Sequence, residues 1–257
     1  MANASVRLAV DIGGTFTDVV VETGRAQHTK KVLTTPRAPE AGVMDGVLGV
    51  LAEAGLAVAA VEVVIHGTTL ATNAIIERKG ARTALIATDG FRDTLDIADE
   101  GRYDQYDIEI EKPRPLVPRA RRFTVPERVD VEGRVRRPLD EDAVAALAPR
   151  LEAAGIESAA VALMHSYANP GHERRIAGLL REALPGLWLT LSSECCPEIR
   201  EYERTSTACA NAYVQPLMAG YIARLEALLE KAGFTGALYL MTSGGGLAAP
   251  EIGRAHV

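Results

Sequence analysis

The stretch Asp11-Ile-Gly-Gly-Thr-Phe-Thr-Asp18 follows one apolar run, residues 6–10, and leads into a second, residues 16–21. Short apolar runs bounded by glycine are typical of β-strands, and glycine permits backbone angles that other residues avoid in a tight turn. The sequence therefore predicts a strand, a tight glycine turn and a second strand, which together form a β-hairpin.

The turn of this hairpin has the residues of an anion site. Gly13 and Gly14 leave room for backbone N–H groups to approach an anion, and the hydroxyls of Thr15 and Thr17 add hydrogen-bond donors. An ordinary glycine hairpin with a capping aspartate is the competing interpretation. Two glycines, two threonines and two aspartates within eight residues exceed what a turn needs, so we favour a phosphate-binding loop.

The two aspartates of the motif suggest a metal. Asp11 ends the first expected strand and Asp18 lies in the second, so their carboxylates could hold a hydrated magnesium ion. That ion prefers carboxylate and phosphate oxygens and retains several waters. We therefore predict Asp11 and Asp18 as metal ligands, and Asp11 also as a catalytic residue.

A second candidate motif follows the β-branched run 61–65, where His66-Gly-Thr-Thr69 precedes a helical pattern over residues 70–78. Free N–H groups at a helix N-terminus favour an anionic oxygen. His66 is a candidate catalytic residue that orients substrate or stabilises charge on a reacting carbonyl. A helix cap with a structural histidine is the competing interpretation. The candidate substrate-binding residues are Gly67, Thr68, Thr69 and Asn73.

Strands and helices alternate along the rest of the chain, which predicts an α/β sheet with helices on its faces. Residues 89–122 are rich in charge, tyrosine and proline and are expected to form a long surface excursion. Further strands are expected at residues 31–33, 84–87, 123–138 (as short strands), 159–164 and 187–191, and further helices at 38–54, 141–154, 171–184 and 207–231, the last kinked or divided at Pro216.

The hairpin motif resembles the first phosphate loop of the actin, Hsp70 and sugar-kinase superfamily. Other segments are similar to the hydantoinase A and 5-oxoprolinase family. They are residues 64–80, 88–93, 201–204 with Thr207, and 211–213. The resemblance implies a ribonuclease H-like α/β fold, a mixed sheet flanked by helices, of which the first half is present. It also implies a hydantoinase/oxoprolinase N-terminal domain at 1–195 and the start of a truncated hydantoinase A/oxoprolinase domain at 196–251.

The resemblance implies ATP and Mg²⁺ as cofactors at the hairpin, and a cyclic amide such as 5-oxoproline or a hydantoin as substrate. An unstrained cyclic amide is a poor electrophile, and phosphorylation of its oxygen would create a good leaving group. A B-type partner subunit and an oligomeric full-length protein are implied as well. Acetone and acetophenone carboxylase subunits share these motifs, so phosphorylation of an enolate or bicarbonate stays open. An inactive half or a binding module is a third possibility, and a sugar kinase is disfavoured.

The composition argues against nucleic-acid and membrane partners and indicates the cellular compartment. A formal net charge of −6 and a pI near 5.5 leave no basic field for nucleic acid or an anionic membrane. No stretch reaches the roughly 18 apolar residues of a membrane helix, and no secretion signal is visible, so we expect a cytoplasmic protein. Cys195, Cys196 and Cys209 lack a metal-binding spacing and are expected to be reduced structural thiols.

The superfamily's second phosphate loop and adenosine-binding segment have no counterpart in this sequence, so we expect an incomplete ATP site. Residues 251–257 read Glu-Ile-Gly-Arg-Ala-His-Val, which the start of a widely used sequencing adapter also encodes. Our hypothesis is that residues 252–257 are a non-biological tail and that His256 has no function.

Other charged residues carry weaker signals. Glu201, Glu203 and Arg204 are expected to form either a buried charged knot or a solvated ion pair at the start of a helix. His165 and His172 have no spacing that suggests a metal, and we expect surface or capping positions for both.

Overall fold

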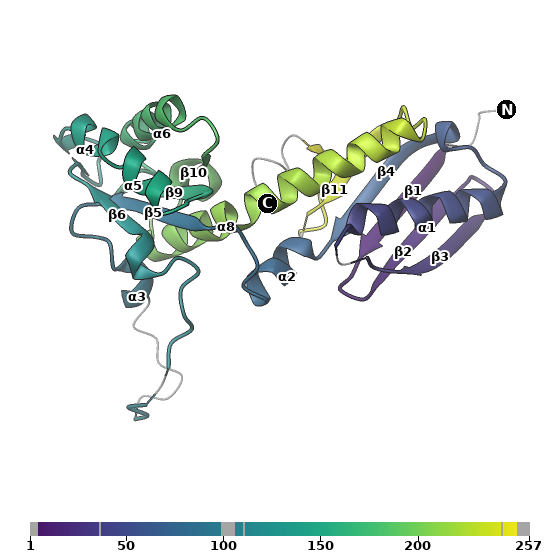
Figure 1. Ribbon diagram of the computed structural model, residues 1–257, viewed down its shortest axis with the longest axis horizontal. Helices are drawn as coiled ribbons and strands as arrows, with labels where there is room; N and C mark the ends of the chain where they lie inside the picture. The colour runs from purple at the N-terminus through teal and green to yellow at the C-terminus, as the bar shows by residue number, and fades with distance from the viewer. Residues whose placement is uncertain (1–4, 36, 99–105, 110, 243, 251–257) are drawn as a thin grey trace. The chain divides into compact units, whose positions relative to one another are not determined.

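The computed structural model describes residues 5–35, 37–98, 106–109, 111–242 and 244–250. The chain divides into two compact units (Figure 1). The first unit joins Met1–Glu77 with Leu217–Val257, and the second consists of Arg78–Pro216. Within the described ranges, no helix is both long enough and apolar enough to cross a membrane.

The first unit is built on a mixed six-stranded sheet. Its strands, from edge to edge, are β12 (Leu247–Ala248), β11 (Ala237–Met241), β4 (Val61–Thr68), β1 (Val6–Ile12), β2 (Phe16–Glu22) and β3 (Gln27–Leu33). Strands β1, β2 and β3 form an antiparallel meander, whereas β4 runs parallel to β1, and β11 runs parallel to β4. The predicted hairpin is confirmed, and the third strand is longer than expected.

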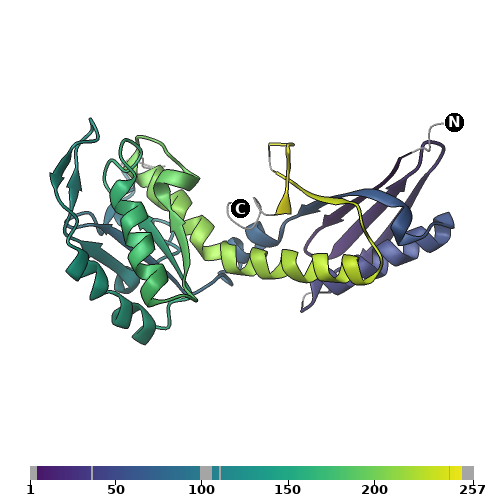
Figure 2. The same ribbon diagram turned by 90° about the horizontal axis from the view of Figure 1, so that it is seen from above.

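Two helices cover one face of this sheet. They are α1 (Pro39–Ala54) and the C-terminal part of α8 (Glu201–Lys231), which Figure 2 shows on the same side of the strands. Along β1, Leu8 and Val10 are buried under the helices, whereas Asp11 is exposed on the other face. Arg224 of α8 and Glu40 of α1 form an ion pair with an Nε–Oε1 distance of 2.7 Å, which joins the two helices.

The second unit contains a parallel sheet that is covered on both faces. Its strands, in order, are β10 (Trp188–Leu191), β9 (Ser158–Ala162), β5 (Thr83–Thr88) and β6 (Arg122–Val125). Ala84 and Ile86 of β5 belong to one core, whereas Leu85 and Ala87 belong to a second core with α8. The first core includes residues of α4 (Glu141–Ala145), α5 (Ala148–Ala153) and α6 (Gly171–Ala183). Burial on both faces explains the continuous apolar run that predicted β5.

Short elements complete the two units. They are η1 (Val58–Ala60), α2 (Leu70–Ile76), α3 (Thr94–Ile97), η2 (Arg119–Arg121), β7 (Arg128–Val129), β8 (Val135–Arg137) and α7 (Ser192–Cys195). The expected excursion over residues 89–122 contains only α3, η2 and the first residue of β6 as regular structure in its described part. Residues 99–105 and 110 of that excursion lie outside the described residues, as does the expected tail at 252–257.

Two expected helices differ from those observed. The helix predicted over residues 141–154 is divided into α4 and α5, because Pro149 lacks an N–H group and occupies the first turn of α5. Of the two alternatives expected at Pro216, a kink or a division, the division is wrong, since α8 continues through this proline as one helix. The compact units nevertheless divide between Pro216 and Leu217. The domain boundary expected near residue 195 stays a prediction, because sequence domains and compact units need not coincide.

Candidate functional site

The first hairpin places two carboxylates opposite each other. Asp11 and Asp18 are paired residues in the antiparallel register of β1 and β2, and both side chains are on the open face of the sheet. The Gly13 N–H group closes the turn by donating to the Phe16 carbonyl at 2.9 Å. The hairpin therefore sets the spacing of the two acids predicted as metal ligands.

The tip of the hairpin keeps several donors available. The Thr34 N–H group donates to the Thr15 carbonyl at 2.9 Å, and the Thr34 hydroxyl donates to the Gly13 carbonyl at 3.0 Å. These bonds anchor the turn through its carbonyl groups. The N–H groups of Gly14 and Thr15 and the Thr15 hydroxyl have no hydrogen-bond partner among the described residues. These three exposed donors at one turn, the cradle, are the groups here from which an oxyanion can accept hydrogen bonds.

Thr17 does not belong to this cradle. Its side chain is fully buried, and its hydroxyl is hydrogen-bonded to the Thr34 hydroxyl at 3.0 Å. The expectation that Thr17 contributes a donor to a phosphate is therefore corrected. In a strand that alternates between faces, Thr17 faces the helices whereas its neighbour Asp18 faces outward.

Of the two reasons expected for glycine at positions 13 and 14, the unusual backbone angle is wrong. Neither residue has a φ angle in the left-handed region that favours glycine. A Cβ atom at Gly13 would instead lie 3.2 Å from the Phe16 carbonyl oxygen, which is a tight contact. A Cβ atom at Gly14 would lie 3.6 Å from Asn73 Nδ2, which is ordinary van der Waals contact. Close packing and access to the backbone, rather than an unusual φ angle, explain the two glycines.

Asp11 lies in a row of residues that crosses three strands of the open face. Gly67 of β4 is its register partner on one side and Asp18 of β2 on the other. A Cβ atom at Gly67 would lie 3.1 Å from Asp11 Oδ1, so the absence of a side chain there leaves room for the carboxylate. Asp18 forms an ion pair with Lys31 of β3 at 3.0 Å. Asp11 is thus the acid in this row that lacks an ion-pair partner among the described residues.

The second motif is packed directly against the hairpin. The N–H group and the hydroxyl of Thr69 both donate to the Ile12 carbonyl, each at 3.1 Å. Asn73 Nδ2 donates to Thr69 Oγ1 at 3.3 Å and is also the group nearest to Gly14. The Thr68 hydroxyl accepts from the Leu70 N–H group at 3.1 Å, at the first residue of α2. Thr69 and Asn73 therefore pack the second motif against the hairpin within the first unit.

His66 does not occupy the open mouth of this site. It lies inside β4, which continues three residues beyond the predicted end, and its side chain is fully buried under the helices. Its Nε2 atom is 2.8 Å from the hydroxyl of Tyr221 in α8, and Nδ1 has no hydrogen-bond partner in the described part of the chain. Burial lowers the pKa of His66 to about 4, so the imidazole is neutral near pH 7. The expected position at the loop is corrected.

The expected knot of Glu201, Glu203 and Arg204 is not formed. Arg204 is buried, but its guanidinium donates to the carbonyl groups of Glu198 at 2.6 Å and Leu163 at 3.1 Å. Glu203 pairs with Arg200 at 3.4 Å. Backbone oxygens thus take the place of the carboxylates that the sequence suggested, and Arg204 holds the loop before α8 in place.

A chain of polar residues that sequence reasoning missed lies at the carboxyl end of the second unit's sheet. The Thr88 hydroxyl donates to Glu127, whose other oxygen is 2.8 Å from His172 Nδ1. Glu127 follows β6 closely and Thr88 ends β5, so position after a strand was the signal available. His172 is in the first turn of α6 and is mostly buried, so the surface alternative expected for it is wrong. Among the described residues, no group of three or more acidic, histidine or cysteine side chains could hold a metal ion.

The state of the three cysteines is consistent with the structural role expected for them. All three are free, and burial raises the pKa of the Cys195 and Cys209 thiols to about 12. Both thiols are therefore protonated at neutral pH, and a thiol is a much weaker nucleophile than a thiolate.

Comparison with known proteins identifies the family. Residues 7–184 match the sequence family described as the hydantoinase/oxoprolinase N-terminal region, and residues 204–256 match the family described as hydantoinase/oxoprolinase. The chain belongs to the hydantoinase/oxoprolinase family. Both matches follow the order of the motifs in the sequence.

Relatives in this family include a caprolactamase subunit and a 5-oxoprolinase. The chain is 35% identical to the caprolactamase subunit alpha of Pseudomonas jessenii over 96% of this chain and 37% of that subunit. It is 33% identical to the 5-oxoprolinase of Saccharomyces cerevisiae over 95% of this chain and 22% of that enzyme. The chain thus spans about a third or less of the length of these relatives.

Two solved structures share the fold. The crystal structure of the ATP-dependent caprolactamase from Pseudomonas jessenii matches with a TM-score of 0.87 and 34% identity, over 95% of this chain and 36% of that chain. A nucleotide-free acetone carboxylase structure matches with a TM-score of 0.86 and 26% identity, over 98% of this chain and 38% of that chain. The predicted fold class, a mixed α/β sheet flanked by helices of the actin-like ATPase type, is confirmed in this hydantoinase/oxoprolinase family member.

Proposed function

We propose that the protein uses ATP to open a cyclic amide, such as 5-oxoproline or a hydantoin, as part of a larger subunit. The observation that carries this proposal is the hairpin at Asp11–Asp18, with exposed N–H groups at Gly14 and Thr15 beside an accessible Asp11 carboxylate. The caprolactamase and the 5-oxoprolinase among its relatives support the reaction class. The identity of the cyclic amide is part of the proposal and does not follow from these relatives.

The residues present fit a phosphate group. The Gly14 and Thr15 N–H groups and the Thr15 hydroxyl would donate hydrogen bonds to its oxygens. Asp11 fits a magnesium ion that keeps most of its waters, since the described residues supply too few ligands for a closed metal site. Asp18 fits less well, because Lys31 already neutralises its carboxylate. ATP and Mg²⁺ at this hairpin are part of the proposal.

When bound, ATP supplies the phosphoryl group that converts the amide oxygen into a leaving group. Addition of one water to the amide carbon breaks the C–N bond, and the ring nitrogen takes a proton and leaves as an amine. The resulting acyl phosphate reacts with a second water and gives a carboxylate and inorganic phosphate. Ring opening therefore consumes one ATP and two waters for each amide.

The chain's own residues divide the work in this proposal. Asp11 and the hairpin tip hold and orient the phosphate end of the site. Asn73 and Thr69 fix the hairpin relative to α2. His66 is a positioning residue rather than a group that touches substrate, because it is buried and engaged with Tyr221. Gly67 leaves room for the Asp11 carboxylate, and substrate contacts at Gly67, Thr68, Thr69 and Asn73 remain part of the proposal.

A second candidate function is an ATP-dependent carboxylation. The acetone carboxylase structure matches nearly the whole chain with a TM-score of 0.86, and this match supports carboxylation. The caprolactamase structure supports ring opening with a similar TM-score of 0.87. In this case the same phosphate site would serve phosphorylation of an enolate or bicarbonate. A partner subunit of the B type is proposed for either reaction, with support from the subunit designation of the caprolactamase relative.

Product analysis with labelled bicarbonate separates the two functions. The intact protein, with any subunit that co-purifies, is incubated with Mg-ATP and either a panel of cyclic amides or a ketone with labelled bicarbonate. Ring-opened acid formed with stoichiometric ADP, and no label in organic product, supports the hydrolase. Label in a carboxylated product supports the carboxylase. ATP consumption that responds to neither class of substrate contradicts both proposals.

A further inference from the structure

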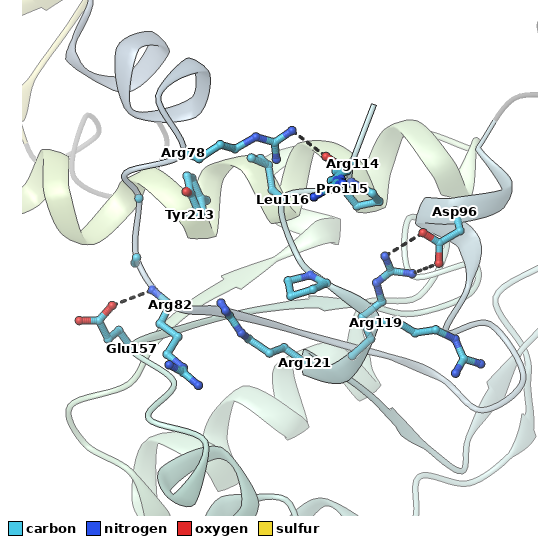
Figure 3. Close-up of a pocket in the computed structure, with 14 residues that line it drawn as sticks. Arg78, Arg82, Asp96, Arg114, Pro115, Leu116, Arg119, Arg121, Glu157 and Tyr213 are labelled. Atoms are coloured by element: carbon cyan, nitrogen blue, oxygen red, sulfur yellow. Dashed lines mark hydrogen bonds and ion pairs between the residues drawn. The ribbon is translucent and has the colours of Figure 1, made fainter. Parts of the chain in front are cut away.

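A pocket of the second unit lies at the amino ends of its parallel strands. It has a volume of about 680 Å³ and is bounded by residues that precede β5 and β9 and by the turn η2 before β6 (Figure 3). Six of the residues that line it are arginines: Arg78, Arg82, Arg114, Arg119, Arg121 and Arg122. The lining contains only two carboxylates, Asp96 and Glu157, so the pocket is strongly cationic although the chain as a whole has a net charge of −6.

Two of these arginines form ion pairs that stabilise the fold. Arg122 is buried and forms a bidentate pair with Asp96, with N–O distances of 2.5 and 3.1 Å, and it also donates to the Val117 carbonyl. Arg119 forms a bidentate pair with Asp93 at 2.8 and 3.0 Å. These hydrogen bonds hold the pKa of both aspartates below the usual range. The two ion pairs build one wall of the pocket and leave little charge to attract a ligand.

The other four arginines have no carboxylate partner in the described part of the chain. Arg78 donates to the Arg114 carbonyl at 2.7 Å, and the guanidinium groups of Arg82, Arg114 and Arg121 have no hydrogen-bond or ion-pair partner among the described residues. Glu157 accepts from the backbone N–H group of Arg82 at 2.6 Å, rather than from its side chain. Figure 3 shows the Arg121 side chain extending toward Arg82. The lining therefore carries four guanidinium groups without a carboxylate partner among the described residues.

The geometry points to a second binding site in this protein, one that takes a small multivalent oxyanion bearing phosphate or carboxylate groups. Like charges gathered in a concave site raise the local potential and attract a counter-ion. The planar guanidinium fork matches the oxygens of phosphate and carboxylate in bidentate geometry. The volume is within the range of small-molecule sites, and Pro115, Leu116 and Pro118 add an apolar wall for an organic body.

This site shares no residue with the proposed ATP site, because all its lining residues belong to the second unit and the hairpin belongs to the first. The inference does not depend on the proposed function. Its concave shape favours a small molecule over a nucleic-acid backbone, which would need an extended basic surface.

Isothermal titration of the intact protein with two probes tests the inference. Inorganic pyrophosphate represents phosphate ligands and citrate represents polycarboxylates. The test variant combines Arg82→Gln with Arg121→Gln, which removes two charges but keeps most of each side chain. The matched control combines Arg137→Gln with Arg181→Gln, two exposed arginines of the second unit that lie outside the pocket. Thermal unfolding of both variants checks that the fold is retained.

We expect at least one probe to bind the wild type. The test variant should bind that probe about 100-fold more weakly, since each of its two lost charge-assisted contacts contributes about tenfold. The control should bind within about twofold of the wild type, and binding should weaken with salt. Binding of pyrophosphate alone identifies a phosphate ligand, and binding of citrate alone identifies a carboxylate ligand. Equal losses in both variants, or no binding of either probe, would overturn the inference. So would pyrophosphate binding that Gly14→Val abolishes but the test variant retains, because that heat would arise at the hairpin.

Discussion

The Nε2 atom of His66 in β4 lies 2.8 Å from the hydroxyl of Tyr221 in α8, and both side chains are buried in the first unit. The two residues are 155 positions apart in the sequence, and the whole second unit lies between them along the chain. This hydrogen bond therefore joins the two segments that build the first unit, on the face of the sheet opposite Asp11.

Removal of the Tyr221 hydroxyl should destabilise the first unit. Tyr221→Phe leaves Nε2 of His66 buried without a partner, so we expect the free energy of unfolding to fall by about 1–3 kcal/mol. Urea unfolding followed by circular dichroism measures the change. Tyr239→Phe is the control, because Tyr239 is in β11 of the same sheet and is only partly buried, and its effect should stay within about 0.5 kcal/mol. Equal effects of the two substitutions would contradict the account.

The buried imidazole should make stability depend on pH. The pKa of His66 is lowered from 6.5 to about 4 in the folded protein, so the unfolded state binds the proton more readily between these values. Stability from this residue is complete above pH 6.5 and is lost as the pH falls toward 4, by an amount on the order of 3 kcal/mol. The measurement compares unfolding of the wild type and His66→Gln from pH 4 to 8. His28→Gln in the exposed strand β3 should keep the wild-type slope, and a His66→Gln profile parallel to the wild type would refute the burial argument.

The space beside Asp11 should matter more for activity than for folding. A Cβ atom at position 67 would lie 3.1 Å from Asp11 Oδ1, and the exposed carboxylate can move away from it. We expect Gly67→Ala to lower turnover about tenfold while stability changes by less than about 1 kcal/mol. Steady-state kinetics and thermal unfolding measure the two effects. Gly178→Ala on α6, where a Cβ atom meets nothing within 4 Å, should leave turnover unchanged.

The tip of the hairpin gives a graded test of phosphate access. Gly14→Val would cover the N–H groups of the turn, and we expect KM for ATP to rise about tenfold or more. Gly14→Ala should have little effect, because its Cβ atom would be in ordinary contact with Asn73 at 3.6 Å. Initial rates over a range of ATP concentrations measure both variants. An unchanged KM in Gly14→Val would remove the turn from the ATP site.

The sequence predicted the elements with strong local patterns. The hairpin from β1 to β2 and the buried strand β5 were recognisable, because glycine turns and continuous apolar runs depend on neighbouring residues alone. The split between α4 and α5 was missed although Pro149 marked it. The division of the chain between two units was not predicted, since it depends on contacts of β4 and α1 with the distant second half of α8.

The candidate site shows a similar limit. A short turn fixes the strand register, so the predicted hairpin already places Asp11 and Asp18 on neighbouring strands. Their role as metal ligands stays a prediction. It could not place His66, because the end of β4 depends on pairing with β1 and β11 and not on local pattern. It assigned Thr17 to the cradle, although strict alternation along β2 would have placed it on the same face as the buried Val19.

The rate of ADP formation by the intact protein tests most directly whether the hairpin is the ATP site. It is measured for the wild type, for Asp11→Asn and for the control Asp45→Asn on the exposed face of α1. Asparagine keeps the shape of the side chain and removes the charge that a hydrated magnesium ion requires. We predict that ADP formation by the wild type depends on the cyclic amide, or on ketone with bicarbonate. The rate of ADP formation should fall about 100-fold or more in Asp11→Asn and should equal the wild-type rate in Asp45→Asn. Near-normal ADP formation by a folded Asp11→Asn protein would contradict the assignment of the hairpin as the ATP site.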